Sequence, residues 1–254
     1  MNILVLVKQT FDTEERIAIH NGEINEDGVE FILNPYDEYA VEEAIKIKEE
    51  SGAEVTVLTV GRDRSENVLR TALAMGADKA IILELEEEAD EYTLSKYIAA
   101  VIKDGRYDLI LGGNMAVDSG AGQVAIRVAE EVGIPHVSTI TGLTIEGNKA
   151  TVERDVEGDV EIVEVSLPFL ATTQQGLNEP RYPSLPGIMK AKKKPLERLS
   201  VEDLELSGID VTVRTSVQDQ YLPPKKQAGK VLEGEINQQV QELFQLLRSE
   251  AKVI

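Results

Sequence analysis

The chain has 254 residues, 42% of them hydrophobic and 28% charged, which suits one large globular domain or one domain with an appendage. Its 46 acidic and 26 basic residues give a formal charge of −20, and this charge argues against a nucleic-acid partner because phosphate would be repelled. The lack of cysteine excludes disulfides and thiolate chemistry, and the presence of only two histidines, His20 and His136, excludes a multi-histidine metal site.

The sequence also lacks membrane and export patterns. No apolar run approaches the roughly 20 residues that a membrane helix needs. The first residues do not show the basic region, apolar region and small-residue site of a signal peptide. We therefore expect a protein that is not embedded in a membrane and that works in the cytoplasm, or inside an organelle after processing.

The first half of the chain alternates two patterns. Near-continuous apolar runs predict strands buried on both faces of a parallel sheet at 2–8, 53–61, 79–85 and 107–113. Apolar residues at helical spacing predict helices at 37–49, 63–75, 91–103 and 119–132. Strands that alternate with helices predict a Rossmann-like α/β layer with a parallel sheet and right-handed crossovers.

The connection between the first strand and the first helix differs from the others. Residues 8–34 carry no helical pattern. The dipeptide Asn21-Gly22 favours a tight hairpin turn, so we expect a small β excursion around it.

Beyond Pro135 the sequence shows strand patterns alone, at 138–147, 149–158, 159–167 and 168–173. Turns are predicted at Gly147-Asn148 and Gly158-Asp159. We expect the segment 136–173 to form an antiparallel flap that covers one edge of the parallel sheet.

The remainder, 174–254, has no sheet pattern. It contains a basic segment, an irregular arm with Pro223-Pro224, and a predicted helix near 235–249. The apolar face of that helix consists of Ile236, Val240, Leu243, Phe244 and Leu247. An amphipathic helix on a long arm has little of its own domain to pack against, so we expect it to dock on a partner or on the body of the chain.

The loop that follows the fourth strand, GGNMAVDSGAGQV at 112–124, is the first candidate site. Ligands of open α/β sheets bind at the carboxyl ends of the strands, where a glycine-rich turn into a helix offers N–H groups and a positive dipole to a phosphate. Gly120 and Gly122 would let a ligand approach the backbone, and Ser119 and Gln123 add donors. The alternative is a tight turn that needs glycine only for packing, because the motif is neither a Walker A loop nor GxGxxG.

The second candidate is Asn34-Pro35-Tyr36-Asp37, at the start of the first predicted helix. Asn34 at the N-cap and Pro35 in the first turn are typical of a helix start, and Asp37 would complement the helix dipole. A capped helix is the simpler local interpretation. The candidate gains weight because both loops are expected to face the same crevice.

Residues for catalysis are not apparent. His20 falls in the β excursion and His136 opens a strand, and single histidines more often have structural roles. Glu153, Arg154 and Asp155 alternate with apolar neighbours, as on the outer face of a strand. No nucleophile, base and oxyanion hole combine, so we expect no enzyme active site in this chain.

The basic segment, NEPRYPSLPGIMKAKKKP at 178–195, is unusual in an acidic chain. Its four lysines stand within five positions, at Lys190, Lys192, Lys193 and Lys194. One interpretation is a solvated patch that binds anions weakly. The other is an exposed loop, stiffened by three prolines, whose apolar tip of Leu185, Ile188 and Met189 docks in a pocket of a partner.

Several strings, in order along nearly the whole chain, resemble the β (small) subunit of electron transfer flavoprotein. They are NPYDEYAVEEA (34–44), RTALAMGADKAI (70–81), AVDSGAGQV (116–124), VERDVEGDVE (152–161) and LNEPRYPSLPGIMKAKKKP (177–195). The resemblance implies an adenine nucleotide α-hydrolase-like variant of the Rossmann-like α/β fold, with an antiparallel β flap and a C-terminal arm. It also implies an electron carrier subunit without catalytic residues of its own.

The resemblance implies cofactors and partners as well. Members of the family pair with a larger α subunit, and the heterodimer carries electrons from acyl-CoA dehydrogenases and similar flavin dehydrogenases to a membrane quinone reductase. The redox FAD is held mainly by the α subunit, and the β subunit buries a structural AMP. A flavin on the partner explains why this chain needs no catalytic residues, since the cofactor supplies the chemistry.

The AMP-binding pattern of the family matches positions at the strand ends described above. These positions are Leu6, Asn34, Pro35, Tyr36, Asp37, Val60, Gly113, Asn114, Met115, Ala116, Val117, Asp118, Ser119, Gly120, Ala121, Gly122, Gln123 and Val124. Tyr36 also matches an aromatic residue near the flavin ring. Asp155 matches a glutamate implicated in electron transfer with the partner, and aspartate is shorter by one methylene.

The basic segment matches the recognition loop of the family. Leu185 stands at the place of the leucine that anchors the dehydrogenase, with Pro186, Ile188 and Met189 beside it. We therefore expect a nucleotide-binding domain at 1–190 that includes the flap (136–173) and the recognition loop (174–195). Residues 191–254 are expected to form an arm and a helix that docks on the α subunit.

Two alternatives stay open. In the flavin-bifurcating branch of the family a second FAD replaces AMP, and the loop typically has Gly-Asp-Thr after the aspartate and Gly-Pro after Gln-Val. Here the loop has Ser119-Gly120-Ala121 and then Ala125-Ile126, which favours AMP. The other alternative is a stand-alone adenine-nucleotide-binding module of the universal stress protein type, which would leave the flap, the basic segment and the arm unexplained.

Overall fold

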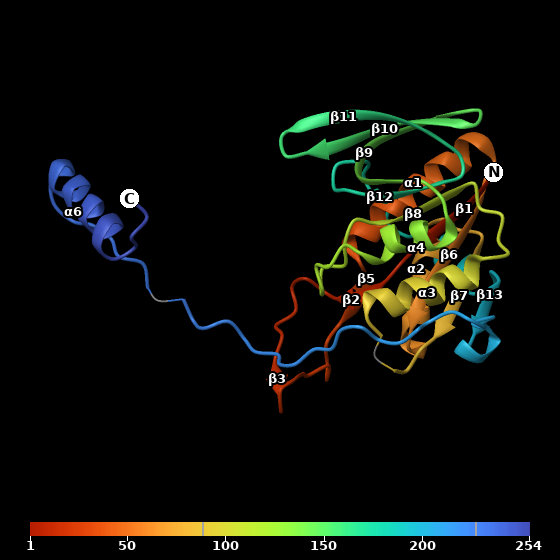
Figure 1. The fold of residues 1–254 in the computed structure, drawn as a ribbon, viewed down its shortest axis with the longest axis horizontal. Coiled ribbons are helices and arrows are strands. Elements are labelled where there is room, and N and C mark those ends of the chain that lie inside the picture. The colour runs from red at the N-terminus through yellow and green to blue at the C-terminus, as the bar shows by residue number, and fades with distance from the viewer. Residues whose placement is uncertain (88, 227) are drawn as a thin grey trace. The chain divides into compact units, whose positions relative to one another are not determined.

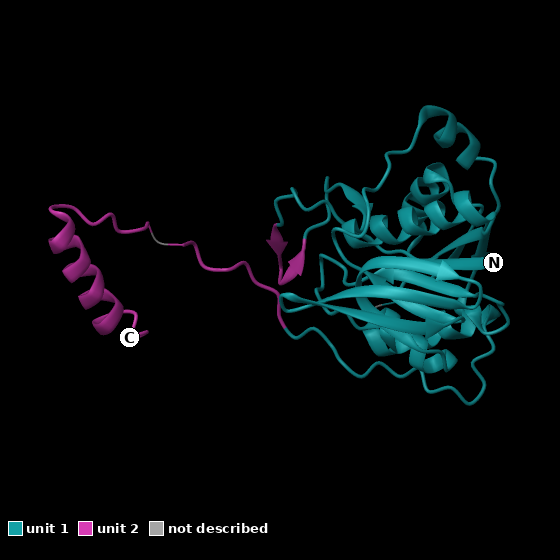
Figure 2. Cartoon of the chain, turned by 90° about the horizontal axis from the view of Figure 1, so that it is seen from above, with its two compact units in different colours: residues 1–17, 25–218 teal, residues 18–24, 219–254 magenta. Residues whose placement is uncertain are grey.

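The computed structural model describes residues 1–87, 89–226 and 228–254. The chain divides into two compact units, coloured separately in Figure 2. The larger unit comprises 1–17 and 25–218, and the smaller comprises 18–24 and 219–254. The larger unit contains the sheet and both candidate loops.

One sheet in the described part of the chain organises the larger unit (Figure 1). Its strands are β1 (Asn2–Leu6), β6 (Glu54–Gly61), β7 (Lys79–Glu84), β8 (Leu109–Gly113), β9 (His136–Glu146), β10 (Lys149–Val156), β11 (Asp159–Ser166), β12 (Phe169–Thr173) and β13 (Leu196–Leu199). Their order is β11-β10-β9-β12-β8-β1-β6-β7-β13. Neighbouring strands pair in parallel from β9 through β12, β8, β1, β6 and β7 to β13. Strand β10 pairs antiparallel with both β9 and β11.

Helices cover both faces of the parallel strands, which confirms the predicted fold class. They are α1 (Pro35–Ser51), α2 (Glu66–Met75, after the 3-10 turn Asp63–Ser65), α3 (Glu91–Ile102) and α4 (Val124–Val132). Alternate residues of one strand face opposite layers. In β1, Ile3 and Val5 share a core with α1 and α2, while Leu4 shares a second core with α3 and α4. This two-sided burial explains the unbroken apolar runs.

The β excursion is confirmed. Strand β2 (Gln9–Phe11) pairs with β5 (Phe31–Leu33), and β3 (Ile19–His20) pairs with β4 (Glu23–Ile24). Asn21 and Gly22 have φ values of 54° and 84°, as a tight hairpin turn between two-residue strands requires.

The predicted antiparallel flap is confirmed for β9, β10 and β11, but its predicted fourth strand is wrong. Strands β9, β10 and β11 form an antiparallel meander that occupies one edge of the parallel strands. The second turn lies at Glu157-Gly158, one residue earlier than predicted. Strand β12 is an interior parallel strand between β8 and β9, and all five of its residues are buried. Its run PFLATT lacks the alternation of a half-exposed strand, and that property marks it as a central strand.

Two expectations for the segment after residue 174 are also wrong: that it contains no strand, and that the basic segment is a loop. Residues Leu185–Ala191 form the short helix α5, which the side chain of Ser184 caps by accepting a hydrogen bond from the Gly187 N–H at 3.1 Å. Strand β13 then pairs in parallel with β7 at the end of the sheet. Ser184 followed by Pro186 in the first turn is a helix-start signal, and a four-residue edge strand with two charges gives a weak strand pattern.

One lysine of the basic segment belongs to the fold. The Nζ of Lys194 donates to the carbonyl oxygens of Leu73 at 2.9 Å and of Ala77 at 2.5 Å, at the carboxyl end of α2. Burial lowers the pKa of Lys194, and the neighbouring Lys48 adds to this effect. Lys190, Lys192 and Lys193 are exposed.

The helix predicted near 235–249 is confirmed as α6 (Ile236–Ser249), in the smaller unit. None of its residues is buried, and its exposed apolar side chains include Ile236, Val240, Leu243 and Phe244. Across the described residues, we find no helix with the length and apolar character to cross a membrane.

Lys194→Ala is expected to destabilise the chain more than Lys192→Ala. The first change leaves two carbonyls at the end of α2 without their donor, which costs about 1–2 kcal/mol of unfolding free energy. The second removes an exposed lysine two residues away and should change that free energy by less than about 0.5 kcal/mol. Urea unfolding of the variants in parallel measures the difference. Equal effects would show that Lys194 does not stabilise α2.

Candidate nucleotide-binding site

A pocket of about 300 Å³ lies at the carboxyl ends of β1, β6 and β8. This is the position at which open α/β sheets bind ligands. Its wall is formed by the strand ends, by the loop between β8 and α4, and by one side of α3. The residues that line it are Leu6, Val7, Lys8, Asn34, Asp37, Leu58, Val60, Ala89, Glu91, Leu94, Ile98, Gly112, Gly113, Asn114, Met115, Ala116, Ser119, Ala121, Gly122, Gln123, Val124 and Ala125.

The two candidate loops therefore meet at one pocket. Most of the positions expected from the sequence line it: Leu6, Asn34, Asp37, Val60, Gly113, Asn114, Met115, Ala116, Ser119, Ala121, Gly122, Gln123 and Val124. The other expected positions lie in the same loops without lining the pocket: Pro35, Tyr36, Val117, Asp118 and Gly120.

Asn34 has a different role from the one predicted. It stands at the N-cap position of α1, but its side chain makes no capping hydrogen bond. The Nδ2 of Asn34 donates to the Met115 carbonyl at 2.9 Å, and its Oδ1 accepts from the Val117 N–H at 3.1 Å. The buried amide therefore joins the start of α1 to the loop after β8.

Asp37 joins three elements. Its Oδ2 accepts from the Lys8 N–H at 2.7 Å and its Oδ1 from the Gly113 N–H at 3.0 Å, so the carboxyl of α1 satisfies backbone donors at the ends of β1 and β8. The residue is 5% exposed. Burial raises the pKa of Asp37 to about 7, and the polar groups of Asn34, Lys8 and Gly113 oppose part of this rise. Asp37 is thus a structural group of the pocket, and not only a partner of the helix dipole.

The same junction leaves no room for a side chain at 113. A Cβ on Gly113 would lie 2.3 Å from the Asp37 Oδ1 and 2.7 Å from the Tyr36 Cβ. From the other side, the Oγ1 of the buried Thr173 contacts the carbonyls of Tyr36 at 3.0 Å and Gly112 at 3.3 Å. The close approach of α1 to β8 therefore requires glycine.

The loop before α4 presents unused donors. Gly120 and Gly122 have φ values of 65° and 60°, the left-handed conformation that glycine adopts without strain. Among the described residues, the N–H groups of Ala121, Gly122 and Gln123 have no hydrogen-bond partner, and α4 has no side-chain cap. A helix start of this kind is suited to an anionic group.

Part of the wall comes from residues that were not predicted from the sequence. Lys8 lines the pocket, and its Nζ lies 2.8 Å from the Asp118 carboxylate, so it connects the end of β1 to the loop. Leu94 and Ile98 of α3 add apolar surface. Their spacing in the sequence is helical, but nothing in the sequence places α3 beside the end of β6.

A second hollow of about 260 Å³ adjoins the pocket, and the two share Lys8, Val60, Ala89 and Leu94. Phe31, Arg62 and Arg64 contribute to its other walls. The Arg64 guanidinium lies 4.0 Å from the centre of the Phe31 ring and pairs with Glu26 at 2.5 Å. The lining of this hollow is more polar than that of the pocket.

The predicted recognition residues lie on α5, and none of them lines the pocket. Leu185 is 79% exposed and Met189 is 73% exposed, while Pro186 and Ile188 are also exposed. Tyr182, which the sequence analysis did not select, is 94% exposed just before the helix. Tyrosine is one of the residue types enriched among those that dominate binding at protein interfaces.

Asp155 lies on β10, exposed and away from the pocket, where its carbonyl accepts a hydrogen bond from Thr139. His20 and His136 are exposed ends of strands. In the part of the chain that the structure describes, no group of histidine, aspartate or glutamate side chains is arranged to hold a metal ion.

Known protein sequences match this chain along most of its length. A family model for the electron transfer flavoprotein domain matches residues 21–204. The chain is 57% identical over 257 residues to the electron transfer flavoprotein subunit beta of Bacillus subtilis (strain 168), with 100% of each chain covered.

More distant relatives are similar over comparable lengths. The chain is 39% identical over 243 residues to the caffeyl-CoA reductase-Etf complex subunit CarD of Acetobacterium woodii, with 92% of each chain covered. It is 34% identical over 259 residues to the mitochondrial electron transfer flavoprotein subunit beta of Arabidopsis thaliana, with 100% of each covered. The chain therefore belongs to the electron transfer flavoprotein family, as a β subunit that serves as an electron carrier.

Proposed function

We propose that the chain forms a heterodimer with an electron transfer flavoprotein α subunit and binds AMP in the pocket at the strand ends. The heterodimer takes electrons from acyl-CoA dehydrogenases and similar flavin dehydrogenases through an FAD held mainly by the α subunit. It passes them to a membrane quinone reductase. The β subunit works in the cytoplasm, positions the partners and contributes no catalytic residue.

The observation that carries the AMP proposal is the mixed lining of the pocket. The unpaired N–H groups of residues 121–123 and the start of α4 suit a phosphate. The same pocket is lined by Leu6, Val60, Leu94 and Ile98, which offer apolar surface to an adenine ring. The volume of about 300 Å³ is at the lower end of the range for small-molecule sites and fits a mononucleotide.

The adjoining hollow raises the alternative of a second FAD in place of AMP. A dinucleotide would need both spaces, and Arg64 with its partner Glu26 stands in the wall of the second. The loop sequence Ser119-Gly120-Ala121 also differs from that of the bifurcating branch. This difference in the loop sequence favours AMP. The full-length family match argues against a stand-alone stress-type module.

Docking on the dehydrogenase is assigned to the exposed face of α5, with Leu185 as the anchor and Pro186, Ile188 and Met189 around it. Helix α6 presents an apolar face without any buried residue and is assigned to the α subunit. Tyr36 is assigned a place near the flavin, and Asp155 a role in electron transfer with the partner.

Extraction of the bound nucleotide tests the cofactor proposal. We expect the chain co-expressed with its α subunit to purify as a yellow complex that releases one AMP and one FAD per heterodimer on denaturation, as identified by mass spectrometry. Two FAD and no AMP would establish the bifurcating alternative. Release of ATP, or purification of a stable monomer with no affinity for an α subunit, would overturn the proposal.

Asp37→Asn is expected to change how stability depends on pH. Burial raises the pKa of Asp37 from 3.8 to about 7, so the folded state binds one more proton than the unfolded state between these values. This contribution to stability is complete below pH 3.8 and is lost as pH rises through about 7. Relative to the variant, the unsubstituted chain should lose up to about 1.4 kcal/mol of unfolding free energy per pH unit.

Urea unfolding between about pH 5 and pH 8 measures this slope. Thr173→Val is the matched control, because it removes a hydroxyl from the same junction without removing a titrating group. It should lower the unfolding free energy equally at each pH. Parallel profiles for Asp37→Asn and the unsubstituted chain would contradict the raised pKa.

Leu185→Ala is expected to weaken recognition of the dehydrogenase. Truncation of an exposed apolar anchor costs about 2 kcal/mol of binding free energy, which corresponds to a roughly 30-fold higher KM for the dehydrogenase. FAD content and melting temperature should stay unchanged, because the side chain is exposed. Val213→Ala, at another exposed apolar residue, is the control. An unchanged KM for Leu185→Ala would end the assignment of α5 as the docking surface.

A further inference from the structure

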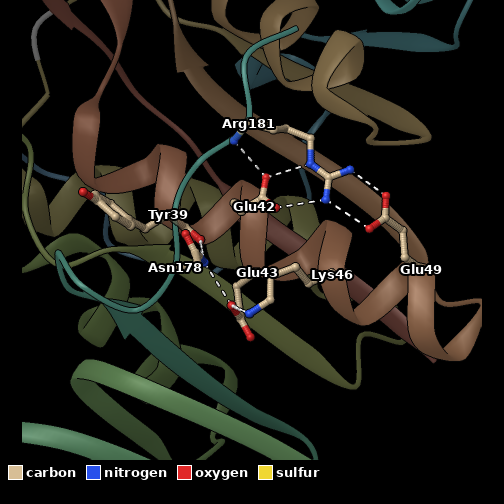
Figure 3. Close-up of polar contacts among 7 residues, drawn as sticks. All are labelled: Tyr39, Glu42, Glu43, Lys46, Glu49, Asn178 and Arg181. Atoms are coloured by element: carbon tan, nitrogen blue, oxygen red, sulfur yellow. Dashed lines mark hydrogen bonds and ion pairs between the residues drawn. The ribbon is translucent and has the colours of Figure 1, made fainter. Parts of the chain in front are cut away.

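The segment that leads into α5 lies along α1, and two polar side chains hold it there (Figure 3). The Nδ2 of Asn178 donates to the Tyr39 carbonyl at 3.0 Å and to the Glu43 carboxylate at 2.9 Å. Three residues later, Arg181 binds two further carboxylates of the same helix. The path of the chain between β12 and α5 is therefore fixed on α1 before the docking helix begins.

Arg181 makes the larger set of contacts. Its backbone N–H, Nε and Nη2 donate to the Glu42 carboxylate at 3.1, 2.9 and 2.9 Å. Its Nη1 and Nη2 donate to Glu49 at 2.6 and 3.0 Å. Hydrogen bonds from Arg181 lower the pKa of Glu49, and both carboxylates raise the pKa of Arg181. The planar guanidinium therefore bridges two turns of α1 in one orientation.

The Glu42 side chain is only 7% exposed, whereas the Arg181 side chain is 34% exposed. A carboxylate removed from water in this way needs its donors, and loss of one partner leaves a charge without compensation. The pair of Arg181 and Glu42 is thus more demanding than a surface ion pair. Its geometry fixes the chain four residues before Leu185.

The other end of α5 is fixed independently. The Nη1 of Arg70, on α2, donates to the Ala191 carbonyl at 2.9 Å, and Lys194 binds the end of α2. The Ala191 side chain is buried. None of these contacts uses the exposed apolar side chains of α5. The docking surface is therefore held in place by residues outside it.

We propose that Arg181 is a positioning residue for recognition of the electron-donating dehydrogenase, acting through its contacts with Glu42 and Glu49 on α1. This inference rests on the proposed docking role of Leu185. Arg181 orders the segment before α5 in the free protein, so less freedom is lost when Leu185 enters its pocket on the partner. Without these contacts, Leu185 is still on the surface, but the segment before it no longer holds it in one position.

The test uses the FAD-containing heterodimer and steady-state electron transfer from an acyl-CoA dehydrogenase. Arg181→Gln is expected to raise the KM for the dehydrogenase by about tenfold, with kcat and FAD content unchanged. Arg181→Lys keeps the charge but cannot bridge both carboxylates, so it should recover only part of the loss. Lys96→Gln is the matched control, because it breaks a 2.6 Å ion pair between α3 and α4.

A double-mutant cycle distinguishes positioning from general stabilisation. If Arg181 acts through Leu185, Arg181→Gln should change KM by less than about twofold when Leu185→Ala is already present. A KM equal to that of the unsubstituted heterodimer, or full additivity in the cycle, would overturn the inference. If the Arg181→Gln heterodimer does not assemble, Glu49→Gln is the deciding variant, because it removes only the exposed partner of Arg181. An unchanged KM for Glu49→Gln would also count against the inference.

The same experiment distinguishes failure of the docking role of α5 from failure of the positioning role of Arg181. If Leu185→Ala leaves KM unchanged, the docking role of α5 fails, and the positioning role fails with it. If Leu185→Ala raises KM and the Arg181 variants do not, only the positioning role fails.

Discussion

The buried carboxyl of Asp37 is the interaction on which the arrangement of the larger unit depends. It accepts hydrogen bonds from the backbone at the ends of β1 and β8, and it belongs to the first turn of α1. This contact sets where the 17-residue helix starts and in which direction it runs. Asn34 then holds the loop of the pocket, and Glu42 and Glu49 hold the lead-in to α5. The pocket and α5 therefore share one stiff support.

The uneven charge distribution of the chain follows from this construction. Residues 181–198 contain six basic side chains in a protein of net charge −20. Three of them bind the acidic body directly: Arg181 pairs with Glu42 and Glu49, Lys194 caps α2, and Arg198 pairs with Asp63, Glu66 and Glu84. The remaining lysines are exposed. Half of these basic side chains thus attach a late segment of the chain to elements that precede it in the sequence.

The sequence predicted the elements whose signals are local. Apolar runs and helical spacing located the parallel strands and the helices, and the Asn21-Gly22 turn located the excursion. The position of β12 was predicted wrongly, because a place in the middle of the sheet depends on neighbouring strands that are far away in the sequence. Strand β13 was not predicted, because an edge strand needs little hydrophobicity. The pocket loops were identified from glycine and strand ends. The roles of Asp37 and Lys8 were not, because they depend on which backbone donors lie opposite.

The connector between α5 and β13 has a fixed length as well as a fixed composition. The carbonyl of Ala191 is held by Arg70, and the carbonyl of Pro195 accepts the N–H of Ala80 on β7. One residue more or fewer between these points would turn Lys194 away from α2 and reverse which side chains of β13 face inward. The connector therefore acts as a spacer of set length, and it fixes the position of α5 relative to the edge of the sheet.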